Sequence, residues 1–343
     1  MTTDEAAMHR AVALARQALG RTSPNPNVGC VILDAARDVV GEGNTAPAGG
    51  PHAEVRALAE AGDRARGGTA VVTLEPCDHT GRTGPCTRAL LSAGVGRVVL
   101  AVRDPNPLAA GGAETLRAAG VELVEGVLAD DARQAMIGWL TAVSRGWPFI
   151  VWKFAATLDG RSAAADRTSQ WITSPAARAD VHRLRGEVDA IIAGVGTVLA
   201  DDPHLTVRSP DGSLAARQPL RVVVDGAGRT PANARVTDRA AETWFVTSAD
   251  RGPVDLQKML EQLYGRGVRT ALLEGGPTLA GAFLRAGLID RVVAYVAPKL
   301  LGAGPAALGD AGINTIADAA DLELIDVTQI GSDVRLTAAV KGA

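Results

Sequence analysis

Three short segments in the first half of the chain carry residues that can bind a metal and move a proton. His52-Ala53-Glu54 opens a stretch with helical spacing, and Cys77 and Cys86 each follow a proline. Catalytic zinc takes three such His and Cys ligands and leaves a fourth position for water, which it activates near neutral pH. A nearby unbound carboxylate, here Glu54, can pass a proton to a departing amine. The pattern is typical of zinc-dependent nucleobase deaminases.

The spacing of the two cysteines departs from the common deaminase signature. Eight residues, 78–85, separate Cys77 from Cys86, whereas the signature has two. The alternative is a structural zinc site closed by a fourth ligand, for which His79 is available. We favour an open catalytic site, because a closed one leaves Glu54 without a purpose. Cys30, inside an apolar run, is expected to be a core thiol.

The elements around these residues alternate between strand and helix, which predicts an α/β domain. Strands are expected at 28–33, 38–41, 69–74 and 97–102, and helices at 52–61, 87–93 and 113–119. His52 and Glu54 then open a helix, while Cys77 follows a strand. The alternation fades at 141–148, where Gly146 and Pro148 interrupt the chain. We therefore expect one domain over residues 1–146 and a second over residues 147–343.

The second half repeats the alternation and adds two glycine-rich turns. Strands are expected at 149–155, 190–193, 220–225, 243–247, 270–274 and 291–296, and helices at 175–185, 256–264 and 278–286. The turns 194–196 and 275–276 each follow a strand, and Pro277 begins a helix. Backbone N–H groups at such turns suit a cofactor diphosphate. A plain turn is the alternative for each glycine pair, since no G-x-G-x-x-G follows a strand.

Composition and charge narrow the possible partners. The 343 residues include 35 basic and 38 acidic side chains, a net charge of −3, so the basic excess of a nucleic-acid-binding protein is missing. No apolar run reaches the roughly 20 residues that span a bilayer. Residues 1–20 carry acids where a secretory signal has bases, and they favour an amphipathic helix. The odd number of cysteines, three, argues against a disulfide framework, so we expect a cytoplasmic protein. The charge balance and the lack of a long apolar run predict no nucleic-acid and no membrane partner.

Longer strings in both halves resemble a single family. LEPCDHTGRTGPCT (74–87), PNPNVGC (24–30) and GGPHAEV (49–55) closely resemble the riboflavin-pathway deaminases. A second set resembles, in sequence and order, the reductase domain of bifunctional members of that family: KFAATLDGRSA (153–163), SQWITSPAAR (169–178), RLRGEVDAIIAGVGTVLADDPHLTVR (183–208) and LEGGPTLAG (273–281). The chain is identified as a member of the bifunctional deaminase–reductase family of riboflavin biosynthesis.

This resemblance implies a fold and two reactions. The fold is a cytidine deaminase-like domain of α/β/α layers followed by a dihydrofolate reductase-like α/β domain. The first reaction is the zinc-dependent hydrolytic deamination of 2,5-diamino-6-(5-phosphoribosylamino)pyrimidin-4-one. The second is the NADPH-dependent reduction of the ribosyl side chain of 5-amino-6-(5-phosphoribosylamino)uracil to ribityl. Zn²⁺ and NADPH are the implied cofactors, and a homo-oligomer is the implied assembly. A chain with only one active domain and a nucleic-acid-editing deaminase remain as alternatives.

The roles of the family transfer by position. The resemblance implies that His52, Cys77 and Cys86 bind zinc and that Glu54 transfers protons. The NADPH site is expected to include Ala155, Trp171, Thr197, Asp201, Gly276, Pro277, Thr278, Leu279, Ala280, Gly281 and Ala282. The substrates are expected to contact Asn25, Arg82, Ser169, Arg185, Leu205, Arg208 and Glu274. Lys153 and Asp202 are further candidates for polarising the reacting carbon.

Some of these positions have other interpretations or depart from the family. Arg185 could instead form an ion pair with Asp180 or Asp189. Arg82 could be a solvated loop charge, and Trp171 could belong to the core. The family usually has a histidine where this chain has Thr45. The substrate contact that this histidine makes in the family is therefore not expected here. The family also usually has Ser and Pro at the positions of Asp78 and Gly84.

Overall fold

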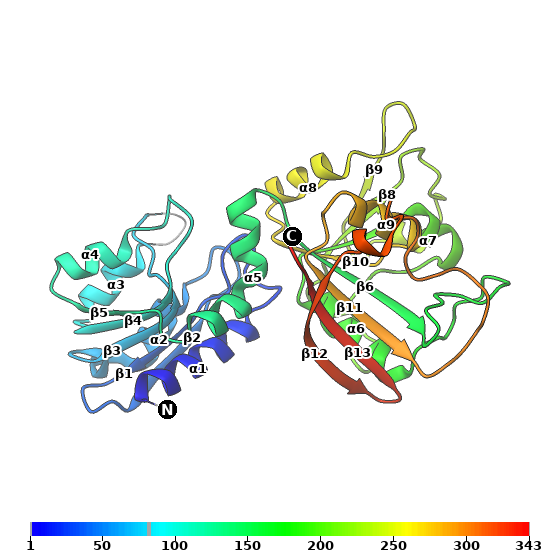
Figure 1. Ribbon diagram of the computed structural model, residues 1–343. Coiled ribbons are helices and arrows are strands. Elements are labelled where there is room, and N and C mark those ends of the chain that lie inside the picture. Colours follow the sequence, from blue (N-terminus) through cyan, green and yellow to red (C-terminus); the bar gives the residue numbers. More distant parts are fainter. Residues whose placement is uncertain (1, 81–83, 343) are drawn as a thin grey trace. The chain divides into compact units, whose positions relative to one another are not determined.

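The computed structural model describes residues 2–80 and 84–342. The chain divides into two compact units, Met1–Gly146 and Trp147–Ala343, each built on its own sheet (Figure 1). The prediction of two successive α/β domains is confirmed. Within the described part of the chain, every helix is too short or too polar to cross a membrane.

The first unit is a five-stranded sheet covered by helices on both faces (Figure 1). In pairing order its strands are β2 (Val39–Asn44), β1 (Gly29–Leu33), β3 (Thr69–Leu74), β4 (Arg97–Val102) and β5 (Glu122–Glu125). β1 runs antiparallel to both of its neighbours, and β3, β4 and β5 are parallel. All residues of β1 and β3 are buried, as expected for strands that are covered on both faces.

Two helix layers enclose this sheet. Its helices are α1 (Thr3–Gln17), α2 (Ala53–Ala61), α3 (Cys86–Ser92), α4 (Gly112–Ala118), α5 (Ala129–Arg145) and the 3₁₀ helix η1 (Gly62–Ala65). α1 packs beside α5 against the sheet, while α2 packs on β2 and β1 and contacts α3. The candidate metal ligands therefore lie in the layer of α2 and α3.

Glycines in the strands allow the helices to approach the sheet closely. A Cβ atom on Gly29 would lie 1.9 Å from the carbonyl oxygen of Ala11 in α1, and one on Gly43 would lie 2.3 Å from that of Ala53 in α2. No other residue can occupy these positions unless the helix moves. Gly43 thus fixes the height of the first turn of α2 above the sheet, the turn that carries Glu54.

The second unit is built on an eight-stranded, mainly parallel sheet. In pairing order its strands are β12 (Leu322–Ile330), β13 (Asp333–Val340), β11 (Arg291–Ala297), β6 (Phe149–Thr157), β10 (Thr270–Leu273), β7 (Ala190–Gly194), β8 (Leu220–Val224) and β9 (Thr243–Val246). The strands from β11 to β9 are parallel, and the β12–β13 hairpin is antiparallel. The C-terminal ends of β6, β10, β7 and β8 therefore meet at one edge, where open α/β sheets bind ligands.

Helices cover both faces of this sheet as well. They are α6 (Pro175–Gly186), α7 (Val195–Asp201), α8 (Leu256–Gly265) and α9 (Pro277–Arg285), with the 3₁₀ helices η2 (Arg235–Thr237) and η3 (Ile316–Asp318). α8 and α9 share a hydrophobic core with alternate strand residues, among them Ile150 and Trp152 of β6. Tyr295 of β11 lies out of phase with the strand residues in that core and donates a hydrogen bond to Asp180 of α6, 2.6 Å long. α6 therefore covers the opposite face.

The helices and strands expected from the sequence are present, with ends shifted by a few residues. Among the described residues, the α-helices and strands that were not predicted are β5, α5, α7, β12 and β13, and the three short 3₁₀ helices were not predicted either. The turn expected at 194–196 is the beginning of α7, with Gly194 as its N-cap.

Candidate functional site

Three elements of the first unit bring the predicted metal ligands together. His52 is the N-cap of α2, Cys77 follows β3, and Cys86 is the first residue of α3. His52 Nδ1 lies 3.5 Å from Cys77 Sγ and 3.3 Å from Cys86 Sγ, and one ligand atom from each residue falls within 4.8 Å of the others. In tetrahedral zinc with bonds of about 2.0 and 2.3 Å, ligand atoms lie about 3.5–3.8 Å apart. The arrangement fits a zinc ion.

The protonation of one of these ligands, Cys77, also suits a metal. Hydrogen bonds from Cys86 and His52, opposed by burial, lower the pKa of the Cys77 thiol to about 4. The thiolate is the form of cysteine that binds metals. His79, the alternative fourth ligand, lines the adjoining cavity but does not belong to the three-residue cluster, which is the only such group found among the described residues.

Glu54 lies in the first turn of α2, and only 4% of its surface is exposed. It lines a cavity of about 320 Å³ together with His52 and Cys77. Burial raises the pKa of Glu54 to about 7, and the nearby charge of Cys77 adds to the shift. A carboxyl group that titrates near neutrality can both accept and release a proton.

The turn at residues 24–27 forms another wall of this cavity and carries Asn25. Trp139 of α5 donates its indole N–H to the carbonyl of Pro24, 3.0 Å away. The Asn27 amide donates to the carbonyls of Ala15 and Ala135, in α1 and α5. Two helices on the far face of the sheet therefore fix the position of Asn25.

Glu75 is a buried polar residue of this site that the sequence analysis missed. Its carboxylate accepts hydrogen bonds from the backbone N–H groups of Asp104, Gly111 and Ala113, at 3.0–3.2 Å. These bonds order the loop that brings Asp104 and Asn106 to the cavity. Burial raises the pKa of Asp104 to about 6. A charged residue directly after a mainly apolar strand was the available signal.

Two loop residues, Thr45 and Asp78, differ from the family pattern, and a third, Arg82, is not described by the structure. Thr45 lines the cavity, and its hydroxyl accepts a hydrogen bond of 3.0 Å from the backbone N–H of Val28. Asp78 accepts bonds of 2.6 Å from the hydroxyls of Thr87 and Thr115, which ties the residue after Cys77 to α3 and α4. Arg82, the predicted phosphate contact, lies outside the residues that the structure describes.

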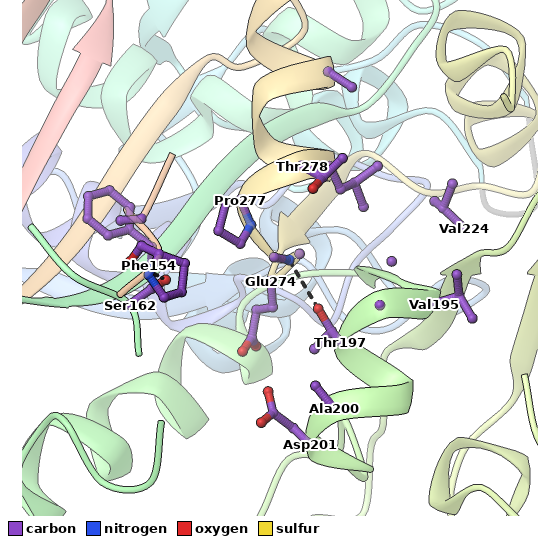
Figure 2. A pocket seen from close by; sticks show the side chains of 18 of the residues that line it. Phe154, Ser162, Val195, Thr197, Ala200, Asp201, Val224, Glu274, Pro277 and Thr278 are labelled. Atoms are coloured by element: carbon purple, nitrogen blue, oxygen red, sulfur yellow. Dashed lines mark hydrogen bonds between the residues drawn. The ribbon is translucent and has the colours of Figure 1, made fainter. Parts of the chain in front are cut away.

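An elongated cavity of about 1180 Å³ follows the C-terminal edge of the sheet in the second unit (Figure 2). The glycine turn 275–276 and the first turn of α9 line it, and the N–H of Gly276 donates to Thr197 Oγ1 at 3.0 Å. The first N–H groups of a helix lack partners within the helix and favour an anion. The middle of the cavity therefore offers a place for a diphosphate.

Most of the residues predicted to contact NADPH line this cavity, and three do not. Ala280 and Gly281 are buried on the other side of α9, where a Cβ atom on Gly281 would lie 2.4 Å from the carbonyl oxygen of Asp310. Trp171 is 61% exposed outside the cavity and stacks with the Arg178 guanidinium, 4.4 Å from the ring centre. The alternative that Trp171 belongs to the core is wrong. The predicted residues that line the cavity are Ala155, Thr197, Asp201, Gly276, Pro277, Thr278, Leu279 and Ala282.

Glu274 is the centre of a buried charge cluster at the end of β10. Arg185 binds its carboxylate with two hydrogen bonds of 2.6 and 3.0 Å, and Lys153 Nζ lies 3.3 Å from Oε2. Although burial opposes ionisation, these two cations lower the pKa of Glu274 to about 2. Lys153 and Glu274 line the cavity, whereas Arg185 lies behind them. The alternative that pairs Arg185 with Asp180 or Asp189 is wrong.

The remaining predicted substrate residues divide between the cavity and a neighbouring loop. Ser169 lines the cavity and donates a hydrogen bond of 3.2 Å to Asp201. Leu205 is buried, and the backbone N–H of Arg208 donates to His182 Nδ1 at 3.2 Å. Asp202 does not line the cavity and instead accepts a bond from the backbone of Arg235.

Models of two families match successive parts of the chain. Residues 1–102 match the cytidine and deoxycytidylate deaminase zinc-binding region, and residues 148–336 match the RibD C-terminal domain. The predicted fold, a deaminase-like domain followed by a reductase domain, is confirmed by these matches and by the solved structures below.

Curated relatives and solved structures agree over nearly the whole chain. Riboflavin biosynthesis protein RibD of Mycobacterium tuberculosis H37Rv is 50% identical over 333 residues, 96% of each chain. The Escherichia coli K12 protein of that name is 43% identical over 97% of this chain and 98% of its own. A structure of Acinetobacter baumannii RibD superposes with a TM-score of 0.90 at 42% identity, covering 99% of both chains. The diaminohydroxyphosphoribosylaminopyrimidine deaminase/5-amino-6-(5-phosphoribosylamino)uracil reductase of Thermotoga maritima superposes with a TM-score of 0.90 at 34% identity, covering 98% of this chain and 99% of its own.

Proposed function

Because the chain belongs to the RibD family of riboflavin biosynthesis, which joins a zinc-binding deaminase domain to an NADPH-dependent reductase domain, we propose which part of this chain performs each reaction. Residues 1–146 deaminate 2,5-diamino-6-(5-phosphoribosylamino)pyrimidin-4-one. Residues 147–343 reduce the ribosyl side chain of 5-amino-6-(5-phosphoribosylamino)uracil to ribityl. The Thermotoga relative is named for both activities, which supports this pair of substrates.

The three-ligand cluster beside a buried glutamate is the observation that carries the deaminase proposal. Zinc held by His52, Cys77 and Cys86 supplies a Lewis acid that activates water. Glu54 accepts the proton of the attacking water and delivers it to the departing amine, and its pKa near 7 suits both transfers. Asn25 positions the pyrimidine from the turn at 24–27, and Arg82 binds the phosphate of the substrate.

The reductase proposal rests on the elongated cavity and the charge cluster beside it. NADPH supplies the hydride for the ribosyl C1, and the residues of this chain place the two reactants. Predicted cofactor residues, among them Ala155, Thr197 and the first turn of α9, line the cavity. Ala280 and Gly281 face away from the cavity, so in our proposal they act only through the packing of α9. Trp171 remains a proposed cofactor contact from its exposed position outside the cavity.

We assign the substrate end of the cavity to the surroundings of Glu274. Arg185 and Lys153 keep the Glu274 carboxylate ionised, so it accepts hydrogen bonds from sugar hydroxyls or the pyrimidine. Arg208 offers a planar fork of donors that suits a phosphate. Ser169 and Leu205 complete the predicted substrate contacts.

Separate assays of the two half-reactions test this assignment. The full chain should bind one zinc ion, release ammonia from the diaminopyrimidine substrate, and oxidise NADPH when given the deaminated substrate. If only one of the two signals appears in a folded, zinc-loaded protein, the alternative with a single active domain is correct. Salt-sensitive binding of RNA would instead support the nucleic-acid-editing alternative.

Location and assembly are further parts of the proposal. Three free cysteines and a reductase that uses NADPH support a cytoplasmic location. The outer strand β12 exposes four apolar side chains, which suits contact with a second copy of the chain: Leu322, Leu324, Ile325 and Val327. Light scattering of the purified chain measures the mass of the assembly, and the change Leu324→Glu should lower that mass if β12 forms the contact.

A further inference from the structure

The reductase cavity has two chemically different ends. Lys153 and Glu274 line it at the ends of β6 and β10, and Val224, Gly226 and Arg229 line it where the chain leaves β8. The sheet order β6-β10-β7-β8 separates these two groups by β7. In Figure 2, Phe154 and Ser162 lie on one side of the glycine turn and Val224 lies on the other. With the reacting groups at Glu274 and the diphosphate at α9, we expect the adenosine of an extended dinucleotide to lie at the end of β8.

Three cationic side chains line this cavity among the residues that the structure describes: Lys153, Arg167 and Arg229. Lys153 is paired with Glu274. Arg167 lies in the loop after β6, two residues before Ser169. Arg229 is exposed, and no hydrogen bond or ion pair of its guanidinium is recorded with any described residue. We propose that Arg229 binds the 2′-phosphate of NADPH and thereby selects NADPH over NADH.

The acidic residue next to Arg229 does not compete for this role. Asp225 is 2% exposed, and its carboxylate accepts bonds from the backbone N–H of Arg229 (2.9 Å) and from both the N–H and the hydroxyl of Thr230 (2.7 Å each). In dinucleotide sites of other folds, a carboxylate facing the ribose favours NAD, and an arginine there favours NADP. Here the carboxylate is turned inward and holds the loop that presents the arginine.

The loop at residues 248–252 fixes the position of the loop at 226–229, which carries Arg229. Ser248 N–H donates to the carbonyl of Gly226 (3.0 Å), and Arg251 Nη2 donates to that of Ala227 (3.0 Å). A Cβ atom on Gly226 would lie 2.0 Å from the carbonyl oxygen of Gly252, so only glycine permits this contact. Asp250 accepts bonds from Ser248 and from the N–H of Gly252. The backbone around Arg229 is therefore held in place before any cofactor binds.

Binding measurements on the full chain test the inference, which rests on the proposed reductase function. Calorimetry gives the dissociation constants of NADP⁺, NAD⁺, 2′,5′-ADP and 5′-AMP without turnover. Arg229→Ala should weaken NADP⁺ and 2′,5′-ADP by roughly 10- to 100-fold, as expected for a lost charge-assisted hydrogen bond. The same variant should leave the dissociation constants of NAD⁺ and 5′-AMP within about twofold of those of the unmodified chain. Arg229→Lys should retain part of the preference, since lysine keeps the charge without the fork.

Two matched variants and the unmodified chain make the outcomes distinct. Arg167→Ala, inside the cavity, should change the dissociation constants of NADP⁺ and NAD⁺ by equal factors. Arg239→Ala, on an exposed loop outside the cavity, should change neither constant. Equal weakening of both dinucleotides by Arg229→Ala, or loss of the preference in Arg167→Ala instead, overturns the inference. If the unmodified chain binds both dinucleotides equally, this inference fails and the reductase function stands. If it binds neither, the reductase function fails as well.

Discussion

Each of the two domains buries a glutamate beside its cavity, and the two carboxyl groups have opposite pKa shifts. No arginine or lysine pairs with the carboxylate of Glu54 among the described residues, and burial raises its pKa to about 7. Glu274 is held by Arg185 and Lys153, which lower its pKa to about 2 against the effect of burial. The same functional group is therefore suited to proton transfer in one domain and to a permanent negative charge in the other.

The two sites also differ in what they demand of the chain. A metal prescribes the residue types of its ligands, and all three lie within residues 52–86. A dinucleotide cavity prescribes backbone geometry, and its lining extends from Lys153 to Ala307. Short motifs therefore identify the first kind of site, while the second depends on how distant strand ends meet. The following predictions test this contrast, beginning with the largest expected effect.

Removal of the metal should abolish the activity of the first domain and leave the activity of the second domain unchanged. A zinc chelator should reduce ammonia release below detection and leave NADPH oxidation on the deaminated substrate unchanged, because the cluster belongs to the first domain only. Circular dichroism should show that the first domain stays folded, since its sheet and core do not include the ligands. Unfolding of that domain on chelation would instead support a structural zinc site.

Glu54→Gln should lower the rate of deamination by about 10²- to 10⁴-fold, the usual contribution of a positioned proton carrier. Zinc content and the reductase rate should stay unchanged, because glutamine fills the same space and is not a ligand. Metal analysis together with the two assays checks this result. Loss of both activities in a folded, zinc-loaded variant would contradict independent sites.

Arg185→Met should destabilise the second domain by about 3–5 kcal/mol, the cost of removing one partner from a buried ion pair. Arg183→Met is the matched control on the same helix. Arg183 is 47% exposed, and its pairs with Asp180 and Glu187 should contribute no more than about 1 kcal/mol. Thermal unfolding followed by near-ultraviolet circular dichroism compares the two. Equal effects would show that Glu274 does not need Arg185.

Gly43→Ala should destabilise the first domain by about 1–3 kcal/mol and slow deamination, because its Cβ meets the backbone of α2 at 2.3 Å. Gly96→Ala is the control, since its Cβ would meet the nearest atom at 3.6 Å. Thermal unfolding and the ammonia assay measure both consequences. An unchanged deamination rate would mean that the height of α2 is not critical for Glu54.

The pH dependence of the second domain should follow the ionisation of Glu274. The folded pKa of Glu274, about 2, lies below its ordinary value of 4.5, so the unfolded state binds more protons between these values. The stabilisation should therefore be complete above pH 4.5 and decline as the pH falls toward 2. Unfolding midpoints measured across this range test it. Glu274→Gln should remove part of the decline, and an identical profile in that variant would contradict the prediction.

Several elements could not be predicted because their patterns are weak. The buried face of α5 consists mainly of alanines, with Met136 and Trp139 as its large residues, so its periodicity is faint. α7 has seven residues and begins at the glycines that suggested a turn. β12 is an outer strand with exposed apolar side chains, so it lacks the alternation that marks a half-buried strand.

By itself, the sequence determined the α/β class, the two-domain order, and the residue types that could bind zinc and carry a proton. These follow from local periodicity and from ligand chemistry, both of which are visible in short segments. Only the tertiary structure decided which charges pair: Glu274 meets Arg185 and Lys153 from positions 89 and 121 residues away. It likewise decided that α9 turns Ala280 and Gly281 away from the cavity. Such pairings depend on strand order, which brings distant strand ends to one edge and which no local pattern encodes.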